Sequence, residues 1–211
     1  DATISNVTLV GGSIRGNNNV GAVVGNANNT TVTNALNSAA VSGNSNVGGI
    51  VGSATNTTVE DAINTGAIEG RENTNGGSNV GGLIGSMDNS HLIGNSYNLG
   101  DVTSIGSNVG GLVGYATNSV IGNEADIDTE ETELVYNRMD VTGAYNVGGI
   151  VGNMEGSIVQ NAENSGTVEA TGYTTEGYTY HTGVRNSGSL PSGTLNVDDG
   201  TVTTTVNIAN A

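Results

Sequence analysis

One short segment of the chain concentrates carboxylates. Within ten residues lie Glu124, Asp126, Asp128, Glu130, Glu131 and Glu133. Alternate carboxylates supply the oxygen ligands that Ca²⁺ prefers, so Asp126, Asp128 and Glu130 are candidate calcium ligands. The segment lacks the central Gly and the terminal Glu of an EF-hand loop, and a solvated acidic loop is the alternative. Paired carboxylates also perform glycan hydrolysis, so a glycan-active enzyme is a further alternative.

A second segment concentrates aromatic side chains. Tyr173, Tyr178 and Tyr180 are three of the seven Tyr in the chain, which has no Phe or Trp. Tyr presents a flat apolar face and a polar hydroxyl, so these residues are candidate contacts to a sugar or a protein. Alternatively, they cover one end of the folded domain.

Several catalytic motifs of common enzymes are absent from the sequence. There are two His, His91 and His181, no Cys, and no His-Glu-x-x-His zinc motif. His91 occupies a position that Thr holds elsewhere, which predicts an exposed strand residue. We therefore predict that the chain is not an enzyme and has no catalytic residues, and that Ca²⁺ is the one cofactor to consider.

The composition limits the partners. The 211 residues include 35 Gly, one Pro, no Lys and four Arg, and the net charge is −16. Nucleic acids and anionic membranes are bound through cationic side chains, so neither is an expected partner. No apolar run approaches the ~20 residues that span a bilayer.

Comparison of the chain with itself reveals a repeat. The phrase Asn-Val-Gly-(Gly/Ala)-hydrophobic-hydrophobic-Gly occurs five times, with spacings of 27, 33, 29 and 38 residues, beginning at Asn19, Asn46, Asn79, Asn108 and Asn146. Thirteen residues after each leading Asn comes an apolar residue: Val32, Val59, Leu92, Ile121 and Val159. A third step, Asn followed four residues later by an apolar residue, begins at Asn37, Asn64, Asn98, Asn137 and Asn164.

Three short β-prone steps separated by Gly and Asn predict an all-β fold, a β-solenoid with three strands per coil and the right-handed crossover that parallel strands favour. Partial copies at 12–16 and 186–190 bring the expected total to about seven coils. Length variation falls between the steps, which predicts inserted loops near 124–134 and 171–181. The solenoid domain is therefore expected to span residues 1–190.

Two details of the coil follow from residue type. Asn at each corner is expected to adopt the left-handed conformation and to pair its amide with the Asn of the next coil. Strict alternation would bury Val47 and Val51 but expose Ile50, so a β-bulge near Gly48 or Gly49 is expected.

The period stops after Pro191. Residues 194–198 and 201–208, separated by Asp199-Gly200, predict a β-hairpin within a C-terminal segment 191–211. This segment is expected to cap the solenoid or to pair with another copy. Its candidate assembly residues are Thr203, Thr205, Val206 and Ile208, because the strand is uncharged and β-prone.

Two phrases of the repeat, Gly82-Leu83-Ile84-Gly85 and Gly111-Leu112-Val113-Gly114, resemble the GLUG motif of bacterial surface proteins. Gly49-Ile50-Val51-Gly52 and Gly149-Ile150-Val151-Gly152 carry Ile instead of Leu, and Ala22-Val23-Val24-Gly25 departs at two positions. The resemblance covers most of residues 1–190. It implies an extracellular, cell-surface location and a structural role, and it supplies no active-site residues.

Two functions are therefore expected. The first is a structural or adhesive scaffold, a stalk or binding segment of a cell-surface adhesin that contacts a protein or a glycan. The second is a subunit of an extracellular filament, joined to other copies through solenoid ends or the C-terminal strand.

Overall fold

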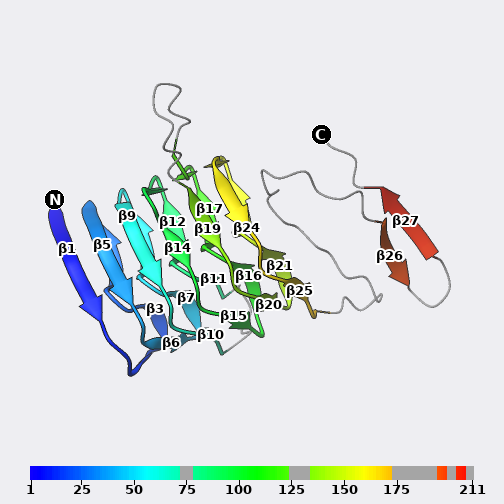
Figure 1. Ribbon diagram of the computed structural model, residues 1–211, viewed down its shortest axis with the longest axis horizontal. Helices are drawn as coiled ribbons and strands as arrows, with labels where there is room; N and C mark the ends of the chain where they lie inside the picture. Colours follow the sequence, from blue (N-terminus) through cyan, green and yellow to red (C-terminus); the bar gives the residue numbers. More distant parts are fainter. Residues whose placement is uncertain (72–77, 124–133, 173–193, 199–202, 208–211) are drawn as a thin grey trace.

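The structure is a computed structural model that describes residues 1–71, 78–123, 134–172, 194–198 and 203–207. All regular elements in these ranges are β-strands, and β1 to β25 stack as parallel strands in one solenoid (Figure 1). The structure therefore confirms the predicted all-β solenoid. Within the same ranges, no helix is long and apolar enough to cross a membrane.

Two parallel sheets, A and B, form one side of the solenoid. Sheet A contains β1 (Ala2–Leu9), β5 (Thr30–Asn37), β9 (Thr58–Asn64), β13 (His91–Ile93), β14 (Tyr97–Asn98), β18 (Val120–Ile121), β19 (Val135–Asn137), β23 (Ile158–Val159) and β24 (Ala162–Asn164). Sheet B contains β2 (Ser13–Arg15), β6 (Ala40–Gly43), β10 (Ile68–Gly70), β15 (Val102–Ser104), β20 (Val141–Gly143) and β25 (Val168–Ala170).

The Gly-rich phrase of each copy forms the opposite side, bent into sheets C and D. Sheet C contains β3 (Asn18–Gly21), β7 (Ser45–Gly48), β11 (Val80–Gly81), β16 (Ser107–Gly110) and β21 (Tyr145–Gly148). Sheet D contains β4 (Val24–Asn28), β8 (Val51–Thr55), β12 (Ile84–Asp88), β17 (Val113–Thr117) and β22 (Val151–Glu155). Each coil thus has the three predicted strand segments, of which the Gly-rich one is broken in two.

The described residues form about five turns rather than the predicted seven. The first complete coil begins at β3 and the last ends with β25, and β1 and β2 add a half coil before them. The half coil confirms the partial copy predicted at residues 12–16. The partial copy predicted at 186–190 lies outside the described residues.

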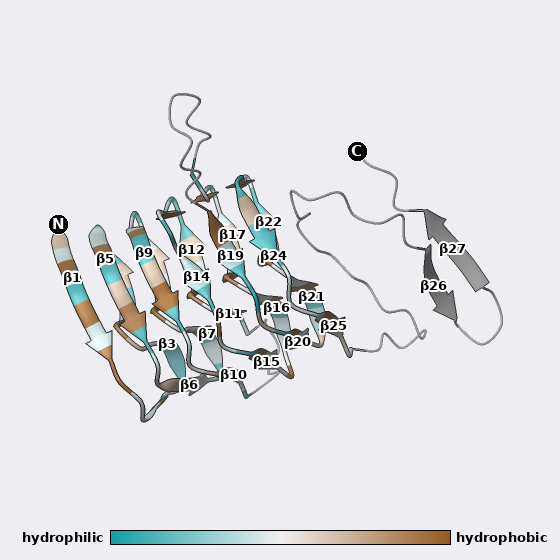
Figure 2. Cartoon of the chain, viewed as in Figure 1, coloured by the Kyte–Doolittle hydropathy of each residue, from teal (hydrophilic) through white to brown (hydrophobic). Residues whose placement is uncertain are grey.

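Equivalent apolar side chains stack in columns through the coils. Val32 pairs in register with Val59, and this column continues through Leu92 and Ile121 to Val159, as the repeat predicts. In sheet B, the column is Ile14, Val41, Ile68, Val102, Val141 and Val168. Figure 2 shows hydrophobic segments at matching places of neighbouring strands. Each coil buries its apolar side chains against the next, which an isolated coil cannot do.

The Gly-Gly pair bends the chain between sheets C and D. β7 ends at Gly48 and β8 begins at Val51, and Val47, Ile50 and Val51 are all fully buried. The expected β-bulge is therefore a break between two strands. Val47 packs in the apolar cluster between sheets B and C, whereas Ile50 and Val51 pack in the larger cluster between sheets A and D.

A ladder of buried amides lies between these two clusters. We call Asn37, Asn64, Asn98, Asn137 and Asn164 the inner ladder. Each Nδ2 donates to the Oδ1 of the next residue of the ladder at 2.8 Å. The same Nδ2 also donates to a backbone carbonyl two residues further along the chain, as in Asn98 to Gly100 at 2.7 Å. Asn37, Asn64, Asn98 and Asn137 are buried and Asn164 is half-buried. Their amides are hydrogen-bonded, which avoids the cost of unpaired polar groups.

A second ladder follows the leading Asn of each phrase. This outer ladder consists of Asn19, Asn46, Asn79, Asn108 and Asn146, and every Nδ2 donates to the preceding Oδ1 at 2.8 Å. Asn19, Asn46, Asn108 and Asn146 are left-handed, with φ between 50° and 59°. The inner ladder has ordinary negative φ, and left-handed Asn29, Asn56, Asn89 and Asn118 form a separate corner row. Pairing and left-handed geometry, predicted together, coincide in the outer ladder and in one further pair, where Nδ2 of left-handed Asn34 donates to Oδ1 of left-handed Asn6 at 2.7 Å.

The C-terminal segment forms the predicted hairpin. β26 (Thr194–Asp198) pairs antiparallel with β27 (Thr203–Asn207), with Thr194 opposite Asn207 and Asp198 opposite Thr203. Thr203, Thr205 and Val206 lie in β27, whereas Ile208 lies outside the described residues.

Replacing Asn98 by Ala should lower the free energy of unfolding by about 3 kcal/mol or more, because Asn64, Asn137 and Gly100 each lose a partner in a buried site. Chemical denaturation measures the effect. Asn95→Ala, in the same coil but exposed, is the matched control and should change stability by less than about 0.5 kcal/mol. Equal effects of the two variants would contradict the role of the ladder.

Replacing Gly111 by Ala should destabilise the protein by about 3 kcal/mol. A Cβ atom there would collide with the carbonyl oxygen of Gly149 and lie 2.6 Å from Cγ of Asn137. Ala22 occupies this place in the first coil and is only half-buried. The reverse change, Ala22→Gly, should therefore cost about 1 kcal/mol at most. Thermal unfolding of both variants checks the difference, and an unaffected Gly111→Ala protein would refute the steric explanation.

Candidate functional site

The outer face of sheet A carries a stripe of large side chains that the solenoid itself does not bury. Leu36 pairs in register with Ile63, Ile63 with Tyr97, and Tyr97 with Tyr136. We call these four residues the outer stripe. Each directly precedes an inner-ladder Asn, and because alternate residues of a strand face opposite sides, the stripe faces outward. All four side chains are half-buried.

The two Tyr rings of the stripe stack face to face. Their centroids are 4.6 Å apart and their planes differ by 3°. This separation is close to the ~4.8 Å between neighbouring strands, so the stacking follows directly from the register of β14 and β19. Cζ of Arg138 lies 4.7 Å from the Tyr136 centroid, which is a cation–π contact.

The surroundings of Tyr136 change its acidity. Partial burial raises the pKa of Tyr136 above the usual 10.0, and the neighbouring Tyr97 and Glu163 raise it further, whereas Arg138 acts to lower it. The phenol therefore stays neutral and able to donate a hydrogen bond well above neutral pH. Neither stripe hydroxyl has a hydrogen-bond partner among the described residues, so both are available to a ligand.

The two Tyr side chains of the stripe are partly covered by each other. The face that each ring turns toward the other is covered, so a sugar ring cannot stack there, and both side chains are half-buried. No group of three His, Asp or Glu in the described part of the chain is placed to hold a metal ion. The stripe can thus supply apolar contact and hydrogen bonds to a partner surface.

In the sequence, the acidic segment lies between two strands of sheet A. β18 ends at Ile121, and β19, which carries Tyr136 of the stripe, begins at Val135. The candidate calcium ligands Asp126, Asp128 and Glu130 lie outside the described residues. The same holds for Tyr173, Tyr178 and Tyr180, so both sets stay predictions.

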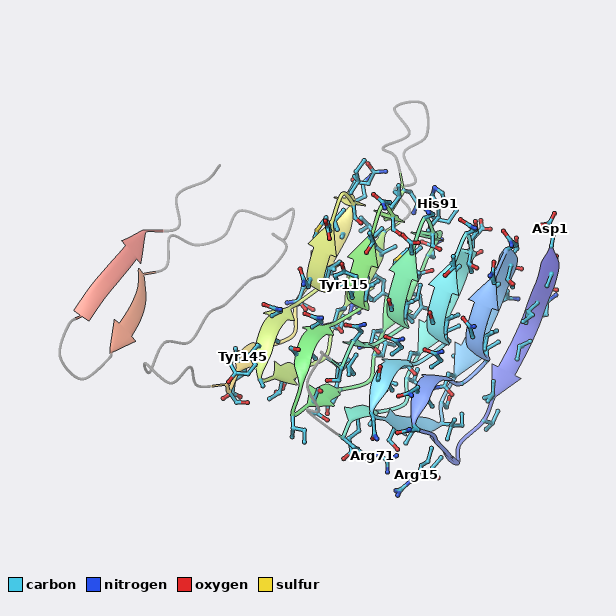
Figure 3. All side chains as sticks on the ribbon, turned by 180° about the vertical axis from the view of Figure 1, so that it is seen from behind. Asp1, Arg15, Arg71, His91, Tyr115 and Tyr145 are labelled. Atoms are coloured by element: carbon cyan, nitrogen blue, oxygen red, sulfur yellow. The ribbon has the colours of Figure 1, made fainter. Side chains whose placement is uncertain are left out.

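His91 is an exposed residue of β13, in register between Thr58 and Val120, as predicted. Figure 3 shows it at the margin of the stack. Tyr97, Tyr136 and Arg138 are not among the site residues predicted from the sequence. The signal was present, because the position before each inner-ladder Asn reads Leu, Ile, Tyr, Tyr and Glu along the five copies.

Comparison with known proteins adds no relative. No protein-family model matches the chain, and no curated protein or solved structure gives a significant match. The class of the chain therefore rests on its own geometry, which is that of a parallel β-solenoid repeat protein.

The neighbours of Tyr136 should shift its titration in opposite directions. Arg138→Gln removes the group that lowers the pKa of Tyr136, so tyrosinate formation should move to higher pH, whereas Glu163→Gln should move it to lower pH. Ultraviolet absorbance during an alkaline titration measures this, and subtraction of the Tyr136→Phe curve assigns it. Shifts in the same direction would contradict the arrangement.

Proposed function

We propose that the chain is an extracellular scaffold, a stalk or binding segment of a cell-surface adhesin, whose inserted segments and outer stripe contact a protein or a glycan. The observation that carries the proposal is the constancy of the stack across copies of unequal length. Successive inner-ladder residues are 27, 34, 39 and 27 positions apart, yet every ladder bond is 2.8 Å long.

The fourth coil illustrates this tolerance. Ile121 pairs with Leu92 before residues 124–133, and Tyr136 pairs with Tyr97 after them, so the register is the same on both sides. A scaffold needs a core that keeps its geometry while surface segments vary. The solenoid has this property, because the corners absorb length and the ladders hold the coils together.

The surface chemistry and the repeat support an extracellular role. The chain has a net charge of −16, no Lys and no Cys, so its partners are expected to be neutral or cationic surfaces rather than nucleic acid. The resemblance of the Gly-rich phrases to the GLUG motif supports a cell-surface location.

Deletion of residues 124–133 tests the scaffold role and the contact role separately. After the deletion, Ile121 and Asn137 are as far apart in the sequence as Leu92 and Asn98 are in the third coil. The unfolding free energy should change by less than about 1 kcal/mol, because loop closure depends only weakly on length. Binding to arrays of surface glycans and surface proteins should be lost or strongly reduced.

The Tyr97→Ser/Tyr136→Ser double variant tests the stripe in the same arrays, with Tyr115→Phe on sheet D as the control. A full-length chain that binds nothing on the arrays or on cell surfaces would refute the adhesive proposal. Strong destabilisation by the deletion would refute the scaffold proposal.

A further inference from the structure

Tyr97 and Tyr136 are the one pair of tyrosines that lie side by side in the described part of the chain. Their strands, β14 and β19, pair in parallel, and the two rings stack with centroids 4.6 Å apart and planes that differ by 3°. The register partners of Tyr115 and Tyr145 in the neighbouring coils are Ser or Asn. A reaction that needs two phenols in contact therefore has one place among the described residues.

The two rings are held in contact by the strands that carry them. Asn98 and Asn137 directly follow the two tyrosines, and a 2.8 Å hydrogen bond of the inner ladder joins their side chains. Cζ of Arg138 lies 4.7 Å from the centroid of the Tyr136 ring and restricts its movement. Two groups that are held together in this way react far more readily than two groups that must first meet by diffusion.

The stacked geometry suits the coupling of two tyrosyl radicals. A one-electron oxidant removes an electron from each phenol, the phenolic proton passes to solvent, and the unpaired spin spreads to the ring carbons ortho to the oxygen. The π lobes of parallel stacked rings point toward each other, so a carbon–carbon bond between two ortho carbons forms across the stack. The hydrogen on each of these carbons then moves to the oxygen of its own ring, which restores both aromatic rings.

We infer that Tyr97 and Tyr136 are an oxidative cross-linking site, at which the two rings are joined as dityrosine by hydrogen peroxide and a haem peroxidase. Each tyrosine gives up one electron and one proton, and one molecule of peroxide is reduced to two molecules of water. Both side chains are half-buried, so part of each ring is open to a small oxidant. The chain has no Trp and no Cys, which leaves Tyr as the side chain that a one-electron oxidant attacks.

The cross-link ties the third coil to the fourth. Tyr97 and Tyr136 are 39 positions apart in the sequence, so the new bond closes a long loop that includes residues 124–133. Closing such a loop restricts the unfolded chain, as a disulfide does. The chain has no Cys with which to form a disulfide. The inference goes beyond the proposed adhesive function and does not depend on it.

Peroxidase treatment of the full chain at low micromolar concentration, followed by digestion with a glutamyl endopeptidase, tests the site. Glu124 and Glu133 lie between the two tyrosines in the sequence, so the digest places them in different peptides unless a cross-link joins them. Mass spectrometry should find the joined peptides, lighter by two hydrogen atoms than their sum, in a yield that does not depend on protein concentration. Tyr97→Phe and Tyr136→Phe should each abolish this product, and Tyr115→Phe should leave it unchanged.

Moving the pair by one coil tests the geometry. Ile63 lies in register with Tyr97 on the side away from Tyr136. The Ile63→Tyr/Tyr136→Phe variant should therefore lose the original cross-link and form one between positions 63 and 97. Circular dichroism checks that each variant is folded. A folded chain that forms no cross-link between positions 97 and 136 overturns the inference. So does one that couples Tyr115 or Tyr145 as readily, because the stacked geometry would then not direct the reaction.

Discussion

The inner ladder is the constraint on which the rest of the structure depends. Each Asn amide must meet the next at hydrogen-bond distance inside an apolar stack, and an unpaired amide there would be costly. Consecutive coils therefore keep the same spacing and the same strand register, whatever the length of the segments between their strands. The same amides fill the space beside Gly49, Gly82, Gly111 and Gly149, so those positions have no room for a Cβ atom. The Gly-Gly phrase and the inner-ladder Asn therefore occur together, because the Asn amide packs where a Cβ atom would otherwise lie.

The ladder also accounts for where the molecule varies. Inward positions hold aliphatic side chains, Met and the ladder amides, whereas outward positions and corners hold side chains of many kinds. The fourth coil accepts a long acidic segment, and its outer face carries Tyr136 and Arg138 without any change in the core. Such a division between a fixed core and a variable surface suits a scaffold, and it supports the proposed adhesive role of the outer stripe and the inserted segments.

The sequence predicts the inward columns well because each inward position repeats the same residue type. The described residues form about five turns rather than the expected seven, because the partial copy at 12–16 adds only a half coil and the one at 186–190 lies outside the described residues. The sequence does not distinguish an inner-ladder Asn from a left-handed corner Asn. Asn37 and Asn29 are the same residue type, and only their φ and burial differ. The sequence does not reveal Tyr97 and Tyr136 as a site, because neighbouring outward side chains can be recognised only once the register of the strands is known.

Hydrogen exchange of the Asn side-chain amides, followed by nuclear magnetic resonance, tests the central claim most directly. If the inner ladder holds the coils together, the Nδ2 protons of Asn64, Asn98 and Asn137 should exchange only when the stack opens, as slowly as the protected backbone amides of β9 and β12. The exposed Asn95 should exchange orders of magnitude faster. Equal and rapid exchange of all four side chains would contradict the account, because the ladder would then not be a permanent part of the folded stack.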